Sequence, residues 1–85
     1  MKYLNRITRT LVDFNPGEIP SPAFFIFDGK RVRVKRIISQ MSVRKTFDNC
    51  ILYKCEIEGE IAAFKVVELR WDKDKDRWFV EKIGE

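Results

Sequence analysis

The residues with the clearest chemical character are five cations that crowd the segment Lys30–Arg36, directly after three phenylalanines in Phe24–Phe27. Lysine and arginine neutralise phosphates, and aromatic rings stack on bases. Sheet faces that combine the two are typical of proteins that bind single-stranded nucleic acid. The sequence therefore yields a set of candidate nucleic-acid-binding residues: Phe24, Lys30, Arg31, Arg33, Lys35 and Arg36.

A predicted β-hairpin around Asp28-Gly29 positions these residues, because both turn residues tolerate positive φ and alternating runs flank them. With a two-residue loop, one sheet face carries two large apolar side chains and three cations: Phe24, Ile26, Arg31, Arg33 and Lys35. With a three-residue loop, the same cations share a face with Phe25 and Phe27 instead. Both registers place cations beside apolar side chains.

A structural role accounts for the same composition. Arginine stems cover an outward phenylalanine through cation–π contact, and cations on an outer strand prevent edge-to-edge aggregation. Two hypotheses therefore stand. One is a non-catalytic nucleic-acid-binding accessory module that uses the basic hairpin face, and the alternative is a protein-interaction or structural domain with no nucleic-acid ligand.

Catalysis is not expected from this chain. It contains no histidine, which is the commonest general base, and its four glycines are scattered rather than gathered in a phosphate-binding loop. Cys50 and Cys55 are five residues apart, so on a strand they point to opposite faces, which disfavours a disulfide or a shared metal ion. We therefore predict that the protein is not an enzyme and has no cofactor.

Three aspartates, Asp72, Asp74 and Asp76, have the 1-3-5 spacing of a calcium loop. The remaining positions fail, because Arg77 stands where the loop needs glycine and Ile83 stands where it needs glutamate. The segment is predicted to be a solvated hairpin loop between Trp71 and Trp78, without bound calcium.

Size and charge limit the domain number, the location and the partners that the sequence allows. The 85 residues form one domain, residues 1–85, with a net charge of +4 and a sequence pI near 9.3. No secretory signal and no run of ~18 apolar residues is present, so we expect a cytoplasmic protein without membrane association. The expected partner is single-stranded nucleic acid or another protein.

The first half of the chain is predicted to hold three segments. Residues 1–14 are predicted to form either a helix or an edge strand. The spacing of Leu4, Ile7, Leu11 and Phe14 suits a helix, but the β-branched residues favour the strand. Residues 1–5 are expected to be frayed. A proline-rich connector spans 15–22, and the compact part covers about 22–84. The second hairpin strand runs to about Gln40, with a β-bulge or bend between Arg36 and Ile38.

The second half is predicted to be a loop over 41–49, a hairpin around Glu58-Gly59, and a final strand over 77–83. In that hairpin Tyr53 pairs with Phe64 and Ile51 pairs with Val66, which gives a core face. The fold class is all-β: an antiparallel meander of five to six strands curled into a barrel or half-barrel, because closure removes unpaired edges.

The order of features from Pro22 to Ile83 also resembles a small uncharacterised bacterial β-rich domain of unknown function. The residues that carry the resemblance are Pro22, Phe24, Gly29, Arg31, Val34, Ile37, Tyr53, Ile57, Gly59, Trp78, Val80 and Ile83. That domain occurs alone or at the end of proteins similar to error-prone DNA polymerases, so the resemblance implies a role in nucleic-acid metabolism. The chain departs from the pattern at Met41, near where the family has tryptophan.

Overall fold

Seven antiparallel strands form one sheet in the computed structural model, which describes residues 2–13, 19–44, 49–61 and 64–84. The strands lie in the order β1-β7-β6-β5-β4-β3-β2. Their bounds are β1 Lys2–Thr8, β2 Thr10–Asp13, β3 Ser21–Phe27, β4 Lys30–Arg44, β5 Asn49–Ile61, β6 Phe64–Asp72 and β7 Arg77–Gly84. The all-β prediction is confirmed, with seven strands in place of five to six.

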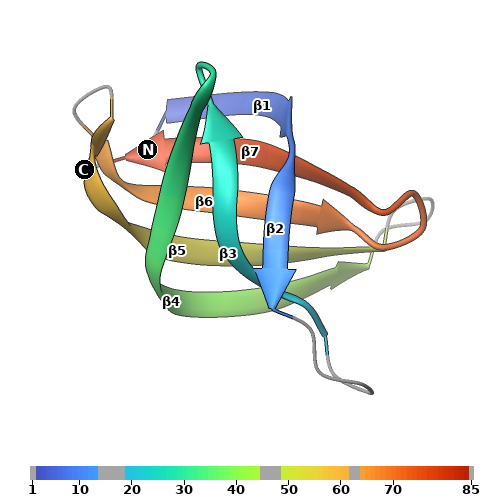
Figure 1. The fold of residues 1–85 in the computed structure, drawn as a ribbon. Helices are drawn as coiled ribbons and strands as arrows, with labels where there is room; N and C mark the ends of the chain where they lie inside the picture. Colours follow the sequence, from blue (N-terminus) through green and yellow to red (C-terminus); the bar gives the residue numbers. More distant parts are fainter. Residues whose placement is uncertain (1, 14–18, 45–48, 62–63, 85) are drawn as a thin grey trace.

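The sheet curls into a half-barrel (Figure 1), which confirms the predicted shape. β2, β3 and the first half of β4 cross in front of a layer made by β1, β7, β6, β5 and the second half of β4. The two outer strands of the sheet, β1 and β2, are consecutive in the chain and are separated only by Arg9. One bent segment therefore supplies both edges.

The N-terminal segment is extended, which settles the choice between helix and strand. β1 pairs with β7 from Lys2 onward, so strand pairing starts earlier than predicted, and β2 pairs with β3. β3 begins at Ser21, and the end of the predicted connector is therefore part of the sheet. Residues 14–18 lie outside the described part of the chain.

β4 bends where the sequence predicts a bulge. Its register against β5 shifts between Val34 and Arg36 and again between Ile37 and Ser39. Bulges bend a strand and increase its twist, which allows one strand to serve both layers. The strand continues to Arg44, so the predicted loop over 41–49 is wrong at its start, and residues 45–48 lie outside the described residues.

The core fills the concave side of the curled sheet. Its buried members come from five strands: Phe25, Phe27, Val32, Ile51, Tyr53, Cys55, Ile57, Val67, Leu69, Trp78 and Val80. The Tyr53 hydroxyl donates a hydrogen bond to the Pro20 carbonyl at 2.6 Å, which ties the segment before β3 to the core. Burial, reinforced by the nearby Cys55 thiol, raises the pKa of Tyr53 to about 12. Cys50 and Cys55 are both buried and unbridged.

The pairing of β5 with β6 differs from the prediction. Tyr53 faces Leu69 and Ile51 faces Trp71, and the predicted turn residues Glu58 and Gly59 lie inside β5. The predicted register is off by five positions, an odd number, so β6 turns its other face inward and buries Val67 and Leu69. Of the predicted core face, Ala62 and the side chain of Phe64 lie outside what the structure describes.

The last hairpin has its turn between Trp71 and Trp78, as predicted. Trp71 and Trp78 are cross-strand partners whose ring centroids are 5.9 Å apart and nearly parallel. The Asp72 carboxylate accepts hydrogen bonds from the backbone of Asp74 and Lys75, and the Trp71 indole donates to Asp76. Two of the three aspartates thus stabilise the turn itself.

Candidate nucleic-acid interface

The tip of the β3–β4 hairpin is a two-residue turn. Asp28 has φ 49° and Gly29 has φ 74°, which is the left-handed geometry that such turns require. Ile26 pairs with Arg31 and Phe24 pairs with Arg33. The two-residue alternative is therefore the observed one, and Phe24, Ile26, Arg31 and Arg33 share the convex face while Phe25 and Phe27 are buried.

Arg31 and Phe24 form a stacked pair on this convex face. The Arg31 guanidinium carbon lies 4.0 Å from the centroid of the Phe24 ring, in cation–π geometry. Within the described part of the chain no carboxylate pairs with Arg31, and none pairs with the exposed Lys30. Arg31 is exposed, so the part of its guanidinium that does not contact the ring is accessible to solvent.

The neighbouring strand β2 adds residues that the sequence analysis did not select. Leu11 pairs with Phe24, and the Ile26 amide donates a hydrogen bond to the Arg9 carbonyl at 3.1 Å, so Arg9 stands opposite Ile26. We call the resulting surface the open patch: Arg9, Leu11, Phe24, Ile26 and Arg31. These residues line a shallow, mostly apolar groove of about 300 Å³, together with Thr10 and Phe25.

Further along β4 the cations have acidic partners. Arg33 lies 3.5 Å from Glu58, Lys35 lies 3.3 Å from Glu56, and Arg36 lies 2.9 Å from the other oxygen of Glu56. The register shift around Lys35 lets two successive cations reach the same carboxylate. We call this set the paired ladder: Arg33, Lys35, Arg36, Glu56 and Glu58.

Hydrogen bonds from Arg36 and then Lys35 lower the pKa of Glu56, and the charges of both cations add to the effect. Glu56 is thus held ionised between two cations, and it offsets part of their charge. The structure thereby divides the predicted residues into two groups: Phe24, Lys30 and Arg31 lie at the unpaired end of the hairpin, and Arg33, Lys35 and Arg36 lie in the paired ladder.

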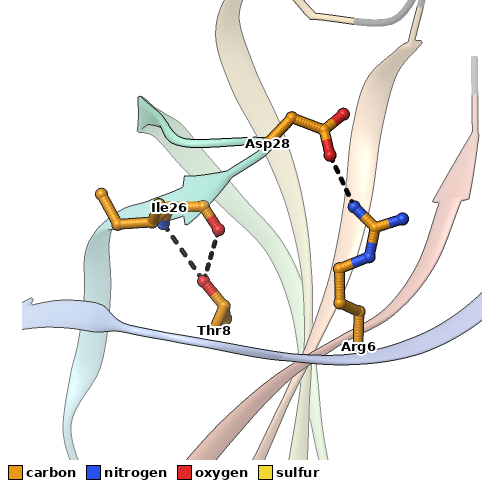
Figure 2. Close-up of polar contacts among 4 residues, drawn as sticks. All are labelled: Arg6, Thr8, Ile26 and Asp28. Carbon is orange, nitrogen blue, oxygen red and sulfur yellow. Dashed lines mark hydrogen bonds and ion pairs between the residues drawn. The ribbon is translucent and has the colours of Figure 1, made fainter.

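The contact that joins the N-terminal segment to the hairpin is drawn in Figure 2. The Thr8 hydroxyl accepts a hydrogen bond from the Ile26 amide at 3.1 Å and donates one to the Ile26 carbonyl at 2.5 Å. Beside it, the Arg6 guanidinium lies 2.8 Å from the Asp28 carboxylate. These contacts hold the bend between β1 and β2 against the hairpin, close to the turn.

Arg9 was missed because its place depends on topology. The alternation of the first segment puts Arg9 and Leu11 on one strand face, but nothing local indicates that this strand pairs with β3.

Two other kinds of site are not found among the described residues. No helix there is long and apolar enough to cross a membrane. Nor does any group of three or more cysteine, aspartate and glutamate side chains there have an arrangement suited to a metal ion.

Comparison of the chain with protein-family models, with curated proteins and with solved structures finds no match. The resemblance to the uncharacterised bacterial domain therefore stays a prediction.

Proposed function

We propose that this protein is a non-catalytic accessory module that binds single-stranded nucleic acid on the convex face of the β3–β4 hairpin. One observation carries the proposal: Arg31 stacks on Phe24 beside an apolar groove, and no described carboxylate neutralises it. An exposed guanidinium beside an aromatic ring is suited to stacking on a base and to binding a phosphate.

Single strands fit this surface better than duplexes. The face is a sheet with a shallow groove, and the described residues contain no helix that would enter a major groove. Unpaired bases can pack on Phe24, Ile26 and the Arg31 plane, whereas bases in a duplex are already stacked on each other. A cytoplasmic role in nucleic-acid metabolism, as the resemblance implies, agrees with such a ligand.

The test is a titration of the wild type with a short single-stranded DNA, the matching RNA and a duplex, at two salt concentrations. We expect single strands to bind best, with affinity falling as salt rises because phosphate contacts release counterions. R31E should reduce affinity at least ~tenfold, since it replaces attraction with repulsion. K73E, at the exposed β6–β7 turn, makes the same charge change at a residue that does not line the groove and should bind like the wild type.

Two results would reject the proposal. The first is a wild type that shows no binding at low salt. The second is an R31E variant that remains folded and binds as tightly as K73E. Either result would favour the protein-interaction or structural alternative.

A further inference from the structure

A second unpaired arginine faces Arg31 across the groove. Because Arg9 stands opposite Ile26, and Ile26 pairs with Arg31, the three residues form a row across β2, β3 and β4. Neighbouring strands are about 4.8 Å apart, so the backbones of the two arginines are separated by roughly 10 Å. Like Arg31, Arg9 is exposed and has no carboxylate partner among the described residues.

The surface between the two arginines is apolar and accessible. Leu11 is 59% exposed and Ile26 is 40% exposed, so both apolar side chains are open to a ligand. An apolar floor with a cation on each side fits a ligand that has negative charges at intervals and a flat apolar group between them. A single nucleic-acid strand has this character, with phosphates on either side of each base.

We infer that the nucleic-acid site is a two-arginine site, in which Arg9 binds a second phosphate and the strand crosses the hairpin from β4 to β2. This inference rests on the proposed function and extends it to a residue that sequence reasoning did not select. One base lies over Ile26 and Leu11, and the flanking phosphates lie at Arg31 and Arg9.

Thr8 is the positioning residue for Arg9. Arg9 belongs to neither β1 nor β2, so its backbone is fixed mainly by contacts at the bend. The two hydrogen bonds between the Thr8 hydroxyl and Ile26, with the Arg9 carbonyl bond beside them, hold that bend against β3. Loss of the hydroxyl leaves Arg9 present but less well aligned with Arg31.

The first experiment measures binding of the same single-stranded DNA to R9A and to R44A, which removes an exposed arginine at the last residue of β4. R9A should lose roughly tenfold in affinity, as the loss of one charge-assisted hydrogen bond does. The log–log salt slope should become less steep by about 0.7, the value for one phosphate contact on a single strand. R44A should change neither quantity.

The second experiment compares T8V with T8S. The first substitution removes the hydroxyl that bonds Ile26, and the second keeps a hydroxyl at the same position. T8V should weaken binding several-fold, and T8S should bind like the wild type. In the R9A background T8V should have no further effect, because Thr8 acts through Arg9.

The outcomes separate this inference from the proposed function. If R31E loses binding but R9A binds like the wild type, the two-arginine site is wrong and the simpler Arg31 site stands. An equal effect of T8V with and without Arg9 would refute the positioning role. Polyglutamate that competes as well as DNA of equal charge would show a general anion surface and overturn the inference, and a wild type without binding would overturn both proposals.

Discussion

The open patch and the paired ladder both draw cations from β4, yet they present different surfaces. At the start of β4, the neighbouring strand β3 offers Phe24 and Ile26, so Arg31 stacks on a ring and keeps its charge. In the middle of β4, the neighbour β5 offers Glu56 and Glu58, so the cations there are paired. The strand alongside, rather than the number of cations, decides where a basic strand attracts an anion.

The largest expected effect is the contrast between charge reversals in these two regions. R31E should lower affinity for single-stranded DNA at least ~tenfold, whereas R33E should lower it only about two- to threefold, because Glu58 already offsets the Arg33 charge. Fluorescence titration of both variants under one salt condition measures the difference. Equal losses would show that the ion pair leaves Arg33 fully available and would remove the distinction between the regions.

A smaller effect is expected from opening the paired ladder. E56Q should raise affinity for single-stranded DNA about two- to fivefold, since Lys35 and Arg36 lose their shared carboxylate and become available to phosphates. The salt slope should steepen at the same time. The matched control is E68Q, which makes the same change on β6, where no ion pair of Glu68 occurs among the described contacts. A decrease in affinity for E56Q would contradict the offsetting role of Glu56.

The paired ladder also predicts how stability depends on pH. The folded state lowers the pKa of Glu56 below its usual value of 4.5, chiefly through its hydrogen bond to Arg36. The carboxylate therefore contributes stability above its unfolded pKa, and this contribution is lost as the pH falls through the folded pKa. The difference in melting temperature between wild type and E56Q should be present at neutral pH and narrow below about pH 4.5. A difference in melting temperature that stays constant at acidic pH would contradict the lowered pKa of Glu56.

The smallest effect concerns the individual surface pair of Arg33 and Glu58. Both side chains are well exposed, at 66% and 59%, and such pairs contribute about 0–1 kcal/mol. A double-mutant cycle with R33A and E58A, measured by urea unfolding, should give a coupling free energy in that range. A coupling well above 1 kcal/mol would show that the paired ladder is a main source of stability rather than a modifier of surface charge.

Two hairpins show what the sequence could predict and what it could not. At Asp28-Gly29 both turn residues favour positive φ and the alternation on either side is clear, so the hairpin and one of its two weighed registers were correct. At Glu58-Gly59 only the glycine suits such a turn, and β6 carries apolar residues at both odd and even positions. Either face of β6 could therefore fill the core, and the register was predicted five positions away from the observed one.

The candidate site was half predictable for a related reason. Phe24, Lys30 and Arg31 follow from one local hairpin, because strand alternation fixes the faces once the turn is known. The acidic partners of Arg33 and Arg36 depend on how β4 pairs with β5. The position of Arg9 opposite Ile26 depends on how β2 pairs with β3. Those pairings join segments distant in sequence, which local patterns do not specify.

The division of the N-terminal segment between the two edges of the sheet has a consequence for the order of folding. β2 can pair as soon as β3 has been synthesised, but β1 needs β7, and Lys2 pairs with Ile83. β1 therefore acquires its backbone partner only after the five intervening strands and β7 have been synthesised. Contacts so distant in sequence slow folding to the millisecond-to-second range. During that interval β1 and the outer edge of β6 are exposed together, and a nascent chain is most open to wrong pairing at this stage.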